Sequence, residues 1–170
     1  MKLKSTRKLR TRIGGFQNNH DDRVSIVLGD WVGNIIPIMG GELLVFINEL
    51  SLLTVILPIS AIPDLAESLS KEVSDLLQAL QVPAALVQDV QRELAAVSVV
   101  PAESKRMLSL LREVSYYCQD VVRFTPADRI RNQLDMELDL AGWLHGPAPY
   151  QKPTDLLREI IESHAGQNAA

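Results

Sequence analysis

Three polar side chains interrupt the most apolar part of the chain, and their types could support acid–base chemistry. Asp30 lies within a run rich in β-branched residues, and Asn48 and Glu49 close the next such run. A carboxylate is costly to bury without a partner, so Asp30 must face solvent, cap a turn or meet a base such as Arg7 or Arg106. Two interpretations are open: a structural ion pair between sheet and helix, or a catalytic cluster of Asp30, Asn48 and Glu49.

Several other side chains could bind a ligand beside such a cluster. Arg7 and Lys8 lie in a basic N-terminal arm, and Arg106 and Arg112 lie about two turns apart on one predicted helix. All four could contact phosphate, although arginines with acidic neighbours more often only keep a surface soluble. Trp31 follows Asp30 directly, and so large a side chain predicts use in the core or at an interface.

The histidines do not have metal-ligand spacing. His20, His145 and His164 lie far apart, without HxxxH, HExxH or CxxC. Folding could still bring two of them together with Asp21 or Asp22, but metal sites usually keep at least one local pair of ligands. We therefore expect neither a metal site nor a cofactor.

The remaining motifs also favour structural roles. Cys118 lies on the apolar stripe of a predicted helix, which is typical of a buried, unreactive thiol. Gly14-Gly15 and Gly40-Gly41 lack the GxxxxGK and GxGxxG patterns of phosphate-binding loops. The carboxylates Asp135, Glu137 and Asp139 share one side of an amphipathic helix, and we expect that side to be solvated.

Composition is that of one globular domain. The chain has 170 residues, 46% of them hydrophobic and 22% charged, and its single cysteine excludes an intramolecular disulfide. Its basic start has no apolar segment behind it and is not typical of a signal peptide. Residues 43–63 approach transmembrane length, but interior polar residues and Pro58 favour two buried strands. We expect a cytoplasmic protein without a membrane span.

Charge is unevenly distributed. Net charge is −4, yet residues 1–12 hold six basic groups and no acid, so the remainder carries −10. A basic arm on an acidic body could contact nucleic acid. The simpler interpretation, which we favour, is an edge strand and its following turn kept soluble by Lys and Arg.

Hydrophobic periodicity predicts an α+β fold in a single domain, mainly β over residues 1–58, mainly α over 59–165, with a frayed tail at 166–170. The strands are predicted to form a small antiparallel sheet: an N-terminal strand at 2–7, a meander over 24–57 and a short strand at 97–100. Gly40-Gly41 is typical of a hairpin with a type I′ turn.

Four to five helices are predicted to pack against this sheet. A short helical turn over 7–13 and a loop over 16–23 come first. The main helices begin at Pro63, Pro83, Ser104, Thr125 and Thr154, and a proline-rich loop covers 142–153.

Three motifs resemble a known bacterial family, the domain of unknown function DUF6933. They are LKSTRKL at Leu3–Leu9, LGDW at Leu28–Trp31 and FINELSL at Phe46–Leu52. A helix start common in that family matches loosely at Glu103–Tyr116, without its small residue and Met-Asn pair. The resemblance covers residues 1–122, with the C-terminal helices as an extension. It implies a fold and a bacterial cytoplasmic setting, but no activity.

Two function classes remain. The first is a non-catalytic interaction module of a bacterial small-operon system, of toxin–antitoxin or phage-defence type. Its acidic C-terminal half would bind a basic protein partner, or the chain would form a homo-oligomer. The alternative is a small enzyme acting on nucleic acid or a nucleotide through Asp30, Asn48 and Glu49. It requires those side chains to meet in an open cleft near Arg7 and Lys8.

Overall fold

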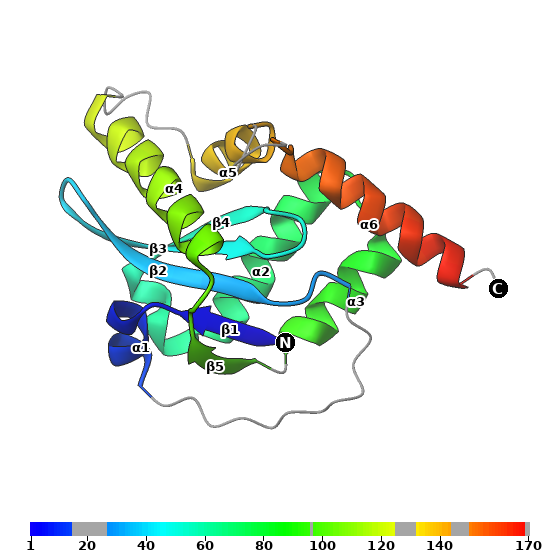
Figure 1. Cartoon of the computed structure of the whole chain (residues 1–170), viewed down its shortest axis with the longest axis horizontal. Helices are drawn as coiled ribbons and strands as arrows, with labels where there is room; N and C mark the ends of the chain where they lie inside the picture. The colour runs from blue at the N-terminus through cyan, green and yellow to red at the C-terminus, as the bar shows by residue number, and fades with distance from the viewer. Residues whose placement is uncertain (15–26, 96, 125–131, 144–149, 169–170) are drawn as a thin grey trace.

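The computed structural model describes residues 1–14, 27–95, 97–124, 132–143 and 150–168 (Figure 1). Its strands are β1 (Lys2–Ser5), β2 (Trp31–Ile38), β3 (Gly41–Asn48), β4 (Thr54–Pro58) and β5 (Ser98–Pro101). Its helices are α1 (Arg7–Ile13), the 3-10 helix η1 (Ile59–Asp64), α2 (Leu65–Ala79), α3 (Ala84–Leu94), α4 (Lys105–Phe124), α5 (Gln133–Ala141) and α6 (Pro153–Asn168). None of these described helices is long and apolar enough to cross a membrane.

The five strands form one sheet in the order β4-β3-β2-β1-β5. The predicted α+β class is confirmed, but the sheet is mixed and not purely antiparallel. β1 runs parallel to both β2 and β5, whereas β2, β3 and β4 form an antiparallel meander. Parallel pairs need a long crossover between their strands, and local sequence patterns do not report such pairing.

β1 is an interior strand, so the prediction of a basic edge strand is wrong. Leu3 and Ser5 are buried, and the chain continues into α1 after the Thr6 N–H donates to the Gly33 carbonyl at 3.0 Å. The Thr6 hydroxyl then accepts from the Leu9 N–H and caps α1. The basic residues of this arm therefore flank a strand that has neighbours on both sides.

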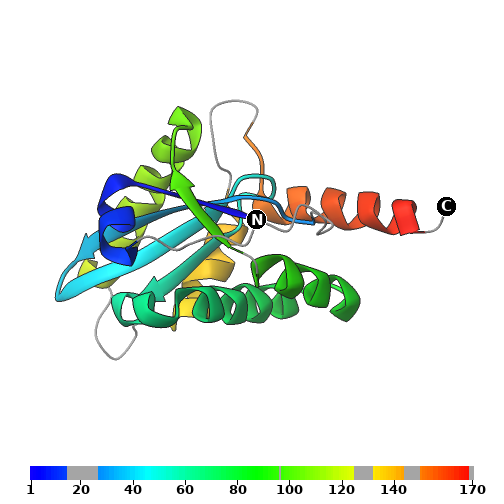
Figure 2. The same cartoon turned by 90° about the horizontal axis from the view of Figure 1, so that it is seen from below.

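Helices cover both faces of the sheet, which explains why its strands are apolar almost throughout. One core lies between the sheet and α1, α2 and α3, and the other lies between the sheet and α4, while α5 and α6 contribute side chains to both. Figure 2 shows α2 and α3 on one side of the sheet and α4 on the other. Alternation along β2 sends Trp31 and Ile35 to the first core and Val32 and Ile36 to the second.

Gly33 is required where α1 crosses β2. A Cβ atom at this position would lie 2.5 Å from ring carbons of Phe46 and 2.9 Å from the Leu9 side chain. The missing side chain therefore lets the large Phe46 ring pack between the strand and α1.

The predicted hairpin is confirmed, but its turn lies one residue earlier than expected. Ile38 pairs with Gly41, so Met39 and Gly40 are the central residues of the turn. Only Gly40 has positive φ, at 92°, and a type I′ turn would require positive φ at both central positions. The type I′ prediction is wrong because Met39 stays in the ordinary region of φ.

Element boundaries differ modestly from the predictions. β2 begins at Trp31 instead of residue 24, and a turn over 49–51 separates β3 from β4 within the predicted meander. The helix predicted at Ser104 is α4, whereas α5 begins at Gln133. The loop predicted at 16–23, the helix start at Thr125 and most of the proline-rich loop lie outside the described residues.

Candidate functional site: the polar end of the sheet and the groove beside α6

Lys4 brings together two of the three predicted catalytic residues. Its Nζ lies 2.5 Å from Glu49 Oε2 and 3.1 Å from Asp30 Oδ2, and all three side chains are about one quarter exposed. The strand register explains the meeting, because Leu3 pairs with Trp31 and Trp31 pairs with Asn48. Asp30 and Glu49 therefore lie at the same end of the sheet as the basic side chain of β1.

This ion cluster of Lys4, Asp30 and Glu49 links β1 to the β2–β3 hairpin. Asp30 Oδ1 accepts the Lys2 backbone N–H at 2.8 Å, and the Asp30 carbonyl accepts the Glu49 N–H at 3.0 Å. Partial burial acts to lower the pKa of Lys4, but hydrogen bonds and attraction from Glu49 and Asp30 outweigh it and raise that pKa. Lys4 therefore stays charged, and the base that meets Asp30 comes from a neighbouring strand and not from a helix.

Asn48 is sealed inside the protein. Its side chain has no exposed surface, and its amide nitrogen donates to the carbonyls of Leu28 at 2.9 Å and Asp30 at 3.3 Å. Its Oδ1 accepts the backbone N–H groups of Leu50 and Ser51 and the Ser51 hydroxyl, at 2.8 to 3.1 Å. These bonds use the hydrogen-bonding capacity of the amide, so Asn48 holds the β3–β4 turn and cannot reach a substrate.

The predicted binding residues do not gather around this cluster. Lys8 pairs with Glu42 at 2.8 Å, near the start of β3, whereas Glu49 follows the end of that strand. Arg7 is exposed on α1, and Trp31 is only 1% exposed and belongs to the core. The structure therefore separates the expected phosphate contacts from Asp30 and Glu49.

Arg106 and Arg112 are exposed on α4, on the opposite side of the sheet from α1. No ion pair between either of them and Asp30 or Glu49 occurs within the described part of the chain.

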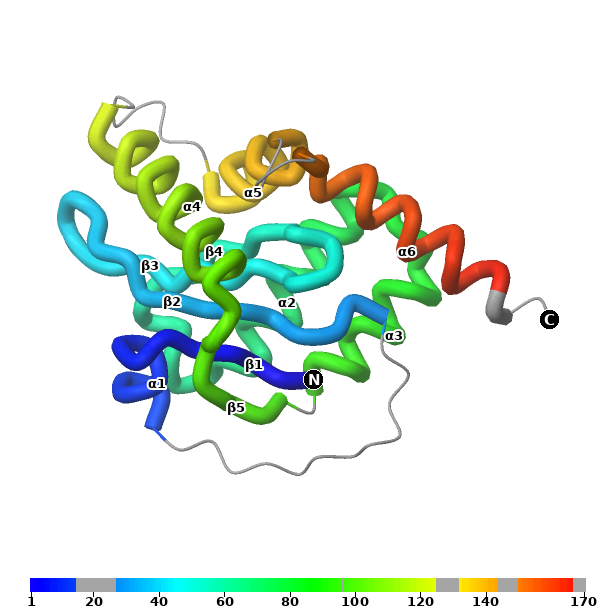
Figure 3. Tube along the Cα trace, in the orientation of Figure 1, coloured from blue at the N-terminus to red at the C-terminus, as the bar shows by residue number. Residues whose placement is uncertain are grey.

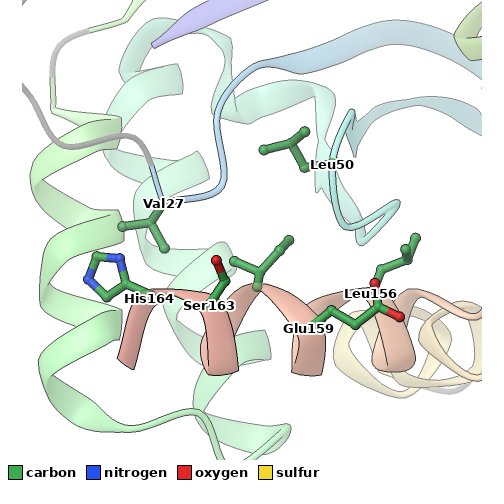
Figure 4. Close-up of a pocket in the computed structure, with 7 residues that line it drawn as sticks. Val27, Leu50, Leu156, Glu159, Ser163 and His164 are labelled. Atoms are coloured by element: carbon green, nitrogen blue, oxygen red, sulfur yellow. The ribbon is translucent and has the colours of Figure 1, made fainter. Parts of the chain in front are cut away.

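A groove of about 340 Å³ opens beside the ion cluster, between α6 and the residues that precede β2 (Figure 4). Val27 and Leu50 line it from the sheet side, and Leu50 directly follows Glu49 in the chain. The lining from α6 consists of Leu156, Glu159, Ile160, Ser163 and His164. The groove therefore combines apolar walls with a carboxylate.

His164 extends from α6 toward α3, and Figure 3 shows the course of both helices. Its Nε2 lies 3.7 Å from Asp89 Oδ2. Ser163, the adjacent residue of the same helix, also lines the groove, but its hydroxyl forms no hydrogen bond with His164 within the described residues. The serine, histidine and aspartate therefore do not form a hydrogen-bonded triad in this structure.

Two buried carboxyl groups bind backbone N–H groups of the segment before β2 and of β4, and neither burial was expected from the sequence. Glu93 on α3 is 2% exposed and accepts the N–H groups of Val27 and Leu28 at 3.2 Å and of Gly29 at 2.8 Å. Burial raises the pKa of Glu93, although the three backbone hydrogen bonds act to lower it. Glu93 lies three residues after Val90 on the apolar face of α3, and this spacing could have predicted its burial.

The prediction that the carboxylate face of α5 is solvated is wrong at Glu137. This side chain has no exposed surface, and its Oε1 accepts the Ile56 N–H at 2.6 Å, on the edge strand β4. Burial raises the pKa of Glu137 to about 9, helped by the nearby Glu72 carboxylate on α2. Its Oε2 has no hydrogen-bond partner of good geometry among the described residues. The Glu137 carboxyl therefore accepts a backbone N–H of an edge strand. It is buried because Met136 and Leu140, on either side of it in α5, face the core.

Metal-ligating side chains do not cluster in the described part of the chain, where no three His, Cys, Asp or Glu residues come together. His20, Asp21, Asp22 and His145 lie outside it. The prediction of a buried Cys118 is confirmed, and burial raises the pKa of its thiol to about 12. That thiol is therefore not a nucleophile at neutral pH.

Fold and site together define an α+β domain in which an interior N-terminal strand is ion-paired to a hairpin beside an acidic, partly apolar groove. The model of the family DUF6933, described as a domain of unknown function, matches residues 2–156, and the chain belongs to this family. The match continues beyond residue 122, through α5 to the start of α6, so the expected C-terminal extension is mostly part of the family's domain. Neither the curated proteins nor the solved structures include a match.

Proposed function

We propose that this protein is a non-catalytic interaction module of a bacterial small-operon system, of toxin–antitoxin or phage-defence type, that binds a protein partner in the cytoplasm. The observation behind this proposal is the groove beside α6, whose apolar lining and exposed Leu50 are typical of a binding surface. The protein's acidic character favours a basic partner.

The polar cluster at the sheet end supports this function more than catalysis. Asn48 is enclosed, and Lys4 already neutralises part of the charge of Asp30 and Glu49. Nucleic-acid binding by the basic arm has less support than its composition suggested. Three of its six basic groups pair with carboxylates within the chain: Lys4, Lys8 and Arg12.

Co-expression with the product of the neighbouring gene tests this function. We expect the two proteins to co-purify and to elute together in size-exclusion chromatography with light scattering. The proposal fails if the purified protein stays a monomer and does not bind that product, or if it turns over nucleotides or nucleic acid without it.

A further inference from the structure

We propose that the groove beside α6 receives a cationic amphipathic segment of the partner protein, which places one large apolar side chain against Leu50, Leu156 and Ile160. This proposal rests on the proposed interaction function, and it names the chemistry of the partner and the place where it binds. The groove has a volume of about 340 Å³, which is enough to receive a large apolar side chain.

The sheet side of the groove is built rigidly. Leu50 is 52% exposed, although the bonds of the buried Asn48 to the N–H groups of Leu50 and Ser51 fix the turn that carries it. Val27 is held in a similar way, because its N–H donates to the buried carboxyl of Glu93. A wall that is ordered before binding costs little conformational entropy when a partner arrives.

The α6 side presents the flank of an amphipathic helix. Leu157 is buried in the core, and Ile160 packs partly against it, which sets the rotation of the helix. Leu156 and Ile160 therefore face the groove with apolar surface that is only partly covered. Figure 4 shows Leu50 on the opposite wall.

Charge at the rim selects a basic partner. Glu159 lines the groove, Glu162 follows within one turn, and neither forms an ion pair with a described residue. The nearby Arg158 is 3.5 Å from Asp155, and Lys4 is engaged by Asp30 and Glu49. Exposed Lys152 lies one turn before Leu156, so the charges over residues 152–162 are Asp155, Glu159 and Glu162 against Lys152 and Arg158, a net charge of −1. Lys or Arg side chains that flank an apolar anchor would complement this negative charge.

Binding of a synthetic peptide tests this proposal. The probe is a fluorescein-labelled amphipathic helix of about 18 residues, with Leu on one face and Lys on the other, and its control has Glu in place of Lys. In fluorescence anisotropy we expect only the Lys peptide to bind, with an affinity that falls as salt is added.

Three protein variants locate the site. We expect Leu50→Asp to weaken binding of the Lys peptide by about tenfold or more, and Glu159→Lys to weaken it by a similar factor. Glu67→Lys makes the same charge change on the exposed surface of α2, away from the groove, and should change affinity less than about twofold. Because Leu50 is exposed, we expect Leu50→Asp to leave Tm unchanged. If the Tm of that variant falls, the peptide affinity of Glu159→Lys tests the site instead.

Three results would overturn the proposal. Equal weakening by Glu67→Lys and Glu159→Lys would mean diffuse attraction to an acidic surface. Full binding by Leu50→Asp would place the peptide elsewhere. A dimer of the protein alone that Leu50→Asp or Glu159→Lys dissociates would make a second copy the occupant of the groove.

The neighbouring gene product separates this proposal from the proposed function. If it binds the wild-type protein and the Leu50→Asp variant equally, the groove is not the docking site but the interaction function stands. If it binds neither, the interaction function itself fails.

Discussion

At the scale of single residues, Asn48 and Lys4 have side chains of kinds that occur in active sites, but here they stabilise the fold. The Asn48 side chain makes five hydrogen bonds without any exposed surface, and Lys4 joins two carboxylates from segments that are distant in sequence. A buried polar group costs free energy when its partner is lost. Substitutions of these residues should therefore lower the stability of the protein before they change any activity.

Asn48→Ala should lower the free energy of unfolding by about 2 to 4 kcal/mol, because the Leu28 carbonyl and the N–H groups of Leu50 and Ser51 lose their side-chain partner. Urea denaturation followed by circular dichroism measures this loss. Ser51→Ala removes one hydroxyl from the same turn and should cost less. Equal stability of Asn48→Ala and the wild type would contradict the structural role.

Lys4→Met should destabilise the protein by about 1 kcal/mol, since all three members of the cluster are partly exposed and solvent screens them. The loss should be smaller when Glu49→Gln is already present, because the substitution then breaks one fewer ion pair. A double-mutant cycle in low and high salt measures the coupling between Lys4 and Glu49, and a coupling energy of zero in low salt would speak against the ion cluster.

At the scale of elements, close packing between α1 and the sheet depends on one glycine. Gly33→Ala should destabilise the protein by about 1 to 3 kcal/mol, because its Cβ would enter the space of the Phe46 ring and the Leu9 side chain. Thermal denaturation measures the effect. Gly41→Ala is the matched control, since nothing lies within 4 Å of a Cβ there, and the two variants should differ clearly in Tm.

Glu137 makes the stability of the whole molecule depend on pH in an unusual direction. Its pKa in the folded protein is about 9, against an ordinary value of 4.5, so the folded state keeps a proton that the unfolded chain releases. Stability from this group is greatest below about pH 4.5 and is lost as pH rises toward about 9. Burial raises the pKa of Glu93 as well, which acts in the same direction.

Glu137→Gln should remove much of this dependence, because Gln does not titrate and its carbonyl can still accept the Ile56 N–H. At pH 8 the variant should be more stable than the wild type by a few kcal/mol, since one pKa unit corresponds to about 1.4 kcal/mol. Denaturant midpoints between about pH 5 and 9 measure the slope. Glu113→Gln, on the exposed face of α4, should keep the wild-type slope; parallel slopes for all three proteins would refute the assignment.

The amino-acid sequence alone determined the local features. The Gly-Gly hairpin, the apolar face of α4 with its buried Cys118, the helix after Pro83 and the family motifs all depend on periodicity or on neighbouring residues. The isolation of Asp30 in an apolar run also predicted that it would face solvent, cap a turn or meet a base.

Only the tertiary structure decided which partner that is. Lys4 reaches Asp30 and Glu49 because β1 inserts in parallel between β2 and β5, a long-range pairing that leaves no local pattern. The burial of Glu137 and the shape of the groove beside α6 also leave no local pattern, because they depend on how α5 and α6 pack on elements far away in the sequence.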